Sequence, residues 1–161
     1  MKLFTFTALL LTFVFQIHAQ KCTDNTFNIE IKNKSEINYH DKNWDKYKSP
    51  IKFNSSVPSD RLYSMEYISI EKKNDIEKAL FDTTELDTLK RGIAVCKIHV
   101  PSGKIVSISF LLQNKVEVSK MKKFKEELEQ NTYFRLKLYA RLKSEGYITQ
   151  SFPIFVSRRK L

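Results

Sequence analysis

Glycine is scarce in this chain, with three residues among 161. They are Gly92, Gly103 and Gly146, so none lies in the first half of the sequence. A phosphate-cradling loop needs glycine because the backbone must come close to the phosphates. The sequence therefore gives no support for a nucleotide site. Proline is also sparse, with four residues, and no proline-rich linker or internal repeat divides the chain.

Cysteine is too rare for the common metal and redox motifs. The two cysteines, Cys22 and Cys96, form no C-x-x-C pair, and neither H-E-x-x-H nor G-x-S-x-G occurs. We therefore expect no metal site and no cofactor. The two thiols could form a disulfide if the chain is exported. The alternative for Cys96 is a buried free thiol, because it lies on the inward side of an alternating run.

The N-terminus has the layout of a secretory signal peptide. Lys2 precedes an apolar run over residues 3–17, and Ala19 follows at the expected cleavage point. The run is shorter than the stretch of about 20 apolar residues that spans a bilayer. A lipid anchor at Cys22 is disfavoured by the polar residues just before it. We expect cleavage of residues 1–19, a periplasmic or secreted product, and no transmembrane span in it.

Positive charge predominates. The chain has 28 lysines and arginines against 18 acidic residues, a formal net charge of +10. Such a charge favours contact with anionic partners, including nucleic acid, lipid headgroups and acidic glycans. No specific nucleic-acid motif accompanies it, and a solvated basic surface is the alternative interpretation.

The first part of the expected domain, residues 20–75, is the less regular one. Alternation of apolar and polar residues predicts a strand over residues 26–31 and another over 62–70. Short helices are predicted over residues 75–81 and 84–89, where apolar residues recur at helical spacing. The remaining residues of this part are polar and ambiguous.

Residues 92–156 carry the clearest pattern. Two alternating runs around the turn at residues 101–104 predict a β-hairpin within residues 92–113. Apolar residues three and four apart predict a helix over residues 118–130. Alternation then predicts a strand over residues 134–143. A helix is the alternative for this segment, because its Leu, Ala, Arg and Lys residues favour helices.

The last strand is predicted over residues 147–156. Pro153 favours an edge position for it, since proline cannot donate a hydrogen bond to a neighbouring strand. The sum is a single α+β domain over residues 20–161. It has a mostly antiparallel sheet with one main helix packed on a face, and its core, residues 92–156, is a ββαβ-type unit.

In the order of these elements, residues 92–156 resemble the C-terminal domain of TonB-like energy transducers. The matching pieces are the strand Gly92–Val100, the turn Pro101-Ser102-Gly103-Lys104, the strand from Ile105, the helix over residues 118–130 and the closing segment from Gly146 to Val156. The resemblance implies a related fold and a protein-binding role. The membrane anchor and long proline-rich linker of those transducers have no evident counterpart, so energy transduction is not implied. The chain is also similar to small uncharacterised exported proteins of Bacteroides-type bacteria.

A basic strand face is one candidate binding surface. Alternation places five side chains together on one face of the strand over residues 134–143: Arg135, Lys137, Tyr139, Arg141 and Lys143. Such a face could hold an anionic ligand. The alternative is an ordinary solvated surface.

Two histidines and a group of aromatic residues are the other candidates. His40 and His99 could serve acid–base cleavage of RNA. The simpler interpretation puts His40 in a polar loop and His99 on the outward side of a strand, without a functional link. A metal site formed by them with Asp41 or Asp45 has no further support. The aromatic group, Tyr39, Trp44 and Tyr47, could stack on sugars or anchor a partner, or it could form the edge of the core.

Together these observations predict an exported, non-enzymatic binding or interaction module of the bacterial cell envelope. Its partner would be an envelope protein or an anionic surface. One alternative is a secreted basic hydrolase of the ribonuclease kind. Another is a binder of anionic lipid or glycan surfaces.

Overall fold

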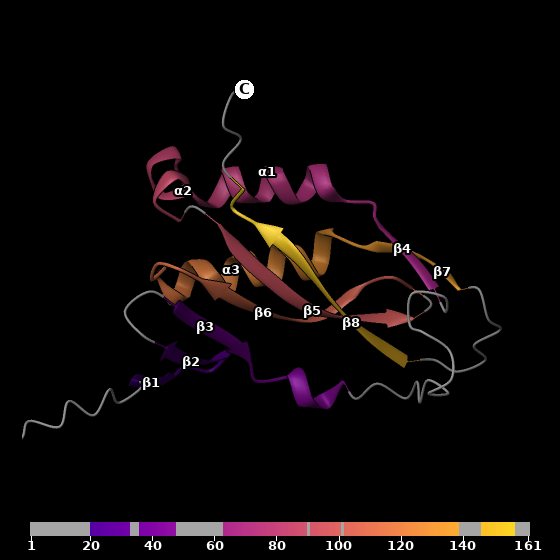
Figure 1. Cartoon of the computed structure of the whole chain (residues 1–161), viewed down its shortest axis with the longest axis horizontal. Coiled ribbons are helices and arrows are strands. Elements are labelled where there is room, and N and C mark those ends of the chain that lie inside the picture. The colour runs from indigo at the N-terminus through magenta and orange to yellow at the C-terminus, as the bar shows by residue number, and fades with distance from the viewer. Residues whose placement is uncertain are drawn as a thin grey trace, which may run out of the picture.

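The computed structural model describes residues 20–32, 36–47, 63–89, 91–100, 102–138 and 146–156. The expected leader, residues 1–19, lies outside them. The described part is an α+β fold (Figure 1). Its elements in chain order are β1 (Gln20–Thr23), β2 (Phe27–Lys32), β3 (Glu36–Asp41), the 3-10 turn η1 (Trp44–Lys46), β4 (Tyr63–Tyr67), α1 (Ile70–Leu80), α2 (Thr83–Leu89), β5 (Gly92–Val100), β6 (Ile105–Leu112), α3 (Val118–Asn131), β7 (Phe134–Leu138) and β8 (Gly146–Ile154).

One antiparallel sheet of six strands organises the described residues, in the order β1-β2-β3-β6-β5-β8. The predicted hairpin is the β5–β6 pair, and β8 returns along the other side of β5. This arrangement makes β8 an edge strand, as Pro153 predicts. The mostly antiparallel α+β architecture expected from the sequence is therefore confirmed.

Gly103 in the β5–β6 turn is required by both conformation and space. Its φ of 71° lies in the left-handed region, where side chains are disfavoured. A Cβ atom there would lie 1.7 Å from the carbonyl oxygen of Phe134. The N–H of Phe134 in turn donates to the carbonyl of Gly103 over 2.8 Å. The turn is thus the point at which the hairpin contacts β7.

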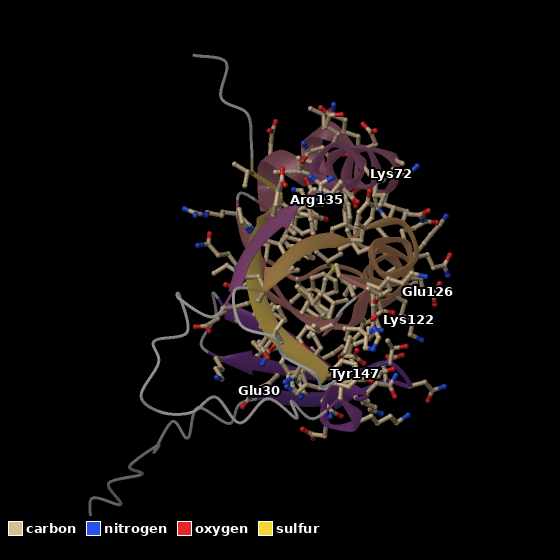
Figure 2. All side chains as sticks on the ribbon, turned by 90° about the vertical axis from the view of Figure 1, so that its right-hand side faces the viewer. Glu30, Lys72, Lys122, Glu126, Arg135 and Tyr147 are labelled. Atoms are coloured by element: carbon tan, nitrogen blue, oxygen red, sulfur yellow. The ribbon has the colours of Figure 1, made fainter. Side chains whose placement is uncertain are left out.

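The helices α1 and α3 pack beside one another and cover one face of the sheet, so that β5, β6 and β8 pass in front of α3 in Figure 1. In Figure 2, Lys72 of α1 and Glu126 of α3 lie on this helical side, while Glu30 of β2 lies on the opposite side. The predicted stripe of α3 is buried as expected, and Phe124 stacks on Phe110 of β6 with ring centroids 5.4 Å apart. Within the described residues, no helix is long and apolar enough to cross a membrane.

The alternation in β5 separates the two faces of the sheet. Ala94, Cys96, Ile98 and Val100 are buried beneath the helices. Val95, Lys97 and His99 between them are half-buried and face the other way. We call this second side the outer face of the sheet.

A second, two-stranded sheet pairs β4 with β7. It confirms that residues 134–138 form a strand and not a helix, while residues 139–143 lie outside the described part. Tyr67 of β4 stacks on Phe134 of β7 with ring centroids 4.5 Å apart. Both rings also contact Phe152 of β8, at centroid distances of 5.0 Å and 5.9 Å, and these contacts tie the small sheet to the main core.

The predicted strand over residues 62–70 is wrong at its end. The strand stops at Tyr67, and α1 begins at Ile70 instead of near residue 75. Lys73 and Glu77 explain the difference, because these charged residues are buried on the inner side of α1 and form an ion pair at i,i+4 spacing. Because the hydrophobic pattern does not reveal buried charges, residues 70–74 were not predicted to be helical.

Candidate functional site

The outer face of the sheet carries a group of half-buried aromatic and basic side chains. Its members come from β3, η1 and the residue after it, β5 and β8: His40, Trp44, Tyr47, Lys97, His99 and Tyr147. We call this group the aromatic–basic patch. Four of its six residues come from three strands. β5 and β8 are neighbours, and β6 lies between β5 and β3.

Trp44 is the central contact of one half of the patch. The Nζ atom of Lys97 lies 4.8 Å from the centroid of the Trp44 ring. The His40 ring lies beside the same indole, with centroids 5.9 Å apart. A cation held over an aromatic face is attracted by the negative potential of the ring. The Trp44 ring thus gathers two basic side chains from different strands.

Tyr147 is the corresponding contact in the other half. Its ring meets the edge of Tyr47 at a centroid distance of 5.1 Å and lies 5.5 Å from the ring of His99. His99 and Tyr147 are opposite one another in the β5–β8 pairing. Figure 2 shows Tyr147 at one end of the molecule, far from Lys72 at the other. Lys97 of the first half and His99 of the second half lie two residues apart on β5, on the same face of the strand.

Buried hydrogen bonds of Asp41 orient the first half of the patch. One oxygen of its fully buried carboxylate accepts the N–H of Asn43 over 3.0 Å, which shapes the turn leading into Trp44. The Asp41 N–H donates to the Ser109 hydroxyl over 3.0 Å. That hydroxyl also lies 3.4 Å from Nδ1 of His40. The positions of Trp44 and His40 therefore both depend on Asp41.

The charge of Asp41 is balanced beneath the sheet by α3. Its other oxygen accepts the Ser107 hydroxyl over 2.5 Å and lies 3.3 Å from Nζ of Lys125. Lys125 also pairs with Glu129 at 2.6 Å. Desolvation raises the pKa of Glu129, and the neighbouring Lys125 opposes that rise. This Asp41–Lys125–Glu129 group links the helix to the strand that carries the patch.

The two histidines share the outer face but do not face each other. The expected polar loop around His40 is instead strand β3, because residues 36–41 pair with β2 and residues 37–39 pair with β6. Ser109 beside it pairs with Val95, and His99 follows four residues along β5. The two backbones are therefore roughly 15 Å apart. An acid and a base acting on one phosphate must both reach it, so the geometry does not favour the ribonuclease alternative.

The predicted basic strand face is only partly described. Arg135 is exposed and lies 3.5 Å from Glu66, its partner in the β4–β7 pairing. Lys137 occupies the next position on that face, opposite Ser64. Tyr139, Arg141 and Lys143 lie outside the described residues. The Glu66 carboxylate offsets part of the charge that this face was expected to present.

The disulfide between Cys22 and Cys96 is not formed. Cys96 is a free, fully buried thiol whose hydrogen points to the carbonyl of Gln150 over 3.4 Å. Three strands separate β1, which contains Cys22, from β5, whereas a disulfide needs Cα atoms closer than about 7 Å. Burial raises the pKa of the Cys96 thiol to about 12. The alternative of an inert core cysteine is therefore the one observed.

Four patch members, His40, Trp44, Tyr47 and His99, could be named from the sequence, but not their common surface. Tyr39, named with Trp44 and Tyr47, is a core residue whose hydroxyl donates to the carbonyl of Val116 over 2.7 Å. Lys97 and Tyr147 were not identified as candidates at all. The alternation around Cys96 and Ile98 predicts an outward position for Lys97, so this residue could have been identified from the sequence. The pairing that brings Tyr147 to His99 could not have been predicted from the sequence.

Three surface hollows lie elsewhere. One of about 190 Å³ is lined by residues of α2 and the segment before α3, including Glu85 and Val116. One of about 320 Å³ lies between α1 and α3, and one of about 500 Å³ lies beside Ile93 and Leu111. None of the three is lined by a patch residue. Among the described residues, no group of three His, Cys, Asp or Glu side chains could hold a metal ion.

Comparison with solved structures found a DUF5043 family protein from Bacteroides uniformis with a similar fold. The TM-score is 0.60, and the match covers 88% of this chain and 87% of that one at 10% sequence identity. At this identity the likeness concerns the fold alone. Neither the protein-family models nor the curated proteins gave a match, so the resemblance to the TonB C-terminal domain gained no support from them.

Proposed function

We propose that this chain is an exported, non-enzymatic binding module of the bacterial cell envelope and that its ligand binds to the aromatic–basic patch. One observation carries the proposal: Nζ of Lys97 lies 4.8 Å from the half-buried ring of Trp44, with His40 on the same indole. Aromatic side chains with a polar neighbour supply a large contact area at low entropic cost.

Several features support binding over catalysis. Cys96 is buried with a strongly raised pKa, so it is not a nucleophile. Ser107 is fully buried beneath the patch. The patch itself consists of rings and basic groups, and hydrogen bonds of Asp41 orient its first half. Such a preorganised surface suits recognition.

Export is supported by the leader over residues 1–19. Amino-terminal sequencing of the protein recovered from its native host tests it. The proposal expects a mature chain that begins at Gln20 in the periplasmic or secreted fraction. A full-length chain in the cytosol would refute the proposed location.

Binding can be followed with the chain's own fluorescence, because Trp44 is its single tryptophan. We expect solubilised cell-envelope polysaccharide to change the intensity or wavelength of Trp44 emission in a saturable manner. Lys97→Met should weaken this response, since it removes the charge and keeps most of the aliphatic stem. Lys72→Met, which removes one charge from exposed α1, is the matched control.

Catalysis is the outcome that would overturn the non-enzymatic part of the proposal. The purified protein is expected to leave single-stranded RNA intact on prolonged incubation. Cleavage of the RNA that is abolished by His99→Ala would instead establish a hydrolase.

A further inference from the structure

The basic groups of the patch are arranged for contact with an anion. His40, Lys97 and His99 lie on one face of the sheet, and their neighbours are rings and hydroxyl groups. The ion pairs of the described residues involve other cations, namely Lys73, Lys120, Lys122, Lys125 and Arg135. No described carboxylate pairs with Lys97. Its charge is held over the Trp44 ring and remains available to an external acid.

The side chains of the two histidines are also oriented by hydroxyl groups. Nδ1 of His99 lies 2.9 Å from the Ser102 hydroxyl, and Nδ1 of His40 lies 3.4 Å from that of Ser109. These contacts hold the imidazoles in place before a ligand arrives, which lowers the entropic cost of binding. The patch thus combines fixed polar groups with fixed rings.

The basic side chains of β5 follow the strand direction. Lys97 and His99 occupy successive outward positions of β5, which are roughly 7 Å apart. A polymer with one carboxylate on each sugar can therefore meet both groups with neighbouring units. The C–H faces of its sugar rings can pack on the adjacent rings of Trp44 and Tyr147.

We infer that the aromatic–basic patch binds an acidic polysaccharide, with uronate carboxylates on Lys97 and the histidines and sugar rings against Trp44 and Tyr147. This inference rests on the proposed function and names its ligand class. Three features favour an acidic glycan over other polyanions: the formal net charge of +10, the aromatic surface beside the charges, and the leader that directs the chain to where such glycans occur.

The test uses polygalacturonate as the probe and its fully methyl-esterified form as the matched neutral polymer. Both are titrated into the full mature chain at low salt, with Trp44 emission and isothermal calorimetry as readouts. Polygalacturonate should bind saturably and lose affinity as salt is raised. The esterified polymer should bind at least about tenfold more weakly, because the charge-assisted contacts are absent.

Two substitutions that each remove one positive charge test where polygalacturonate binds. Lys97→Met should weaken polygalacturonate binding by about tenfold, the effect of one charge-assisted hydrogen bond. Lys72→Met should change it by less than about twofold, because a distant surface charge contributes only screened attraction. Thermal unfolding checks that both variants fold as the unsubstituted chain does.

Three outcomes would overturn the inference. They are equal binding of the acidic and esterified polymers, equal loss in the two lysine variants, and tighter binding of single-stranded poly(U) than of polygalacturonate. If these occur while envelope polysaccharide still perturbs Trp44 in a Lys97-dependent manner, the ligand class is wrong and the proposed function stands. If no probe perturbs Trp44, the proposed function fails as well.

Discussion

Nζ of Lys125 lies 3.3 Å from the fully buried carboxylate of Asp41, across the interface between α3 and β3. Asp41 also accepts hydrogen bonds from the Ser107 hydroxyl and the Asn43 N–H. The residue that anchors the helix to the sheet is therefore the residue that shapes the turn before Trp44. Stability and the geometry of the aromatic–basic patch are linked through this pair.

Lys125→Met should lower the free energy of unfolding by about 3–5 kcal/mol, because it leaves the buried Asp41 charge without its partner. Urea denaturation measures the change. Lys123→Met, at an exposed position of the same helix, should change stability by less than about 0.5 kcal/mol. Similar losses in the two variants would show that Lys125 contributes only its aliphatic stem.

A second buried ion pair holds the end of β8. Lys73 and Glu77 of α1 are buried and 2.8 Å apart, and the Glu77 carboxylate accepts the N–H of Phe155 over 3.2 Å. Phe155 has a φ of 53°, in the left-handed region that a large side chain seldom adopts. The ion pair thus supports a local conformation that is unfavourable by itself.

Glu77→Gln should destabilise the fold by about 3 kcal/mol, because the charge of Lys73 then remains buried without a partner. Adding Lys73→Met should restore part of the loss. The double variant buries no charge, and its glutamine oxygen can still accept the Phe155 N–H. Urea denaturation of both single variants and the double variant forms the cycle. Additive losses would contradict the coupling.

Burial should make Cys96 unreactive in the native protein. In a Cys22→Ser background Cys96 is the only thiol of the mature chain. Iodoacetamide at pH 8 should leave it unmodified for hours in buffer and label it rapidly in concentrated urea, since its pKa is raised to about 12 by burial. Mass spectrometry reads the result. Rapid labelling of the folded chain would mean that β5 opens locally or that the thiol is accessible.

The raised pKa of Glu129 makes its contribution to stability depend on pH. Because the folded-state pKa lies above that of the unfolded chain, protonated Glu129 favours folding, and this contribution is lost as pH rises through the folded-state pKa. Glu129→Gln, which cannot ionise, should therefore gain stability relative to the unsubstituted chain between pH 4 and pH 7. Denaturation at several pH values measures the difference. An opposite trend would mean that the ion pair with Lys125 outweighs desolvation.

Hydrophobic periodicity was sufficient to predict the helices and strands whose buried side is mainly apolar. The alternation of Ala94, Cys96 and Ile98 predicted β5 correctly, as the spacing of Met121 and Leu128 predicted α3. In β5 the inward residues are all apolar, and in α3 they are apolar except for Lys125. For such segments hydrophobic periodicity and structure coincide.

Buried charges account for the elements that were missed or misplaced. Asp41 occupies an inward position of β3, and Lys73 and Glu77 occupy inward positions of α1. Each is buried because a specific partner from the helix or the sheet compensates its charge. The partner of Asp41 is Lys125, which is distant in the sequence, so the β3 segment looked like a polar loop. Lys73 and Glu77 are partners at i,i+4 spacing, but that spacing does not reveal burial, so the first turn of α1 looked like the end of a strand.

The candidate site depended on strand pairing, which sequence alone did not supply. His40, Trp44, Tyr47 and His99 were each noticed, but the distance between them in the chain hid their common surface. The β3–β6–β5–β8 order brings them together and adds Lys97 and Tyr147. Long-range register of this kind is set by the packing of the whole sheet.

The most direct measurement of the central claim is a map of the ligand-binding face by nuclear magnetic resonance. Oligogalacturonate is added to the isotopically labelled mature chain, and shifts are followed for the Trp44 indole, the two imidazoles, Lys97 and Tyr147. The account predicts that the largest shifts occur at these groups and that α1 around Lys72 is unaffected. Shifts confined to β7 around Arg135, or the absence of any shift at Trp44, would contradict it.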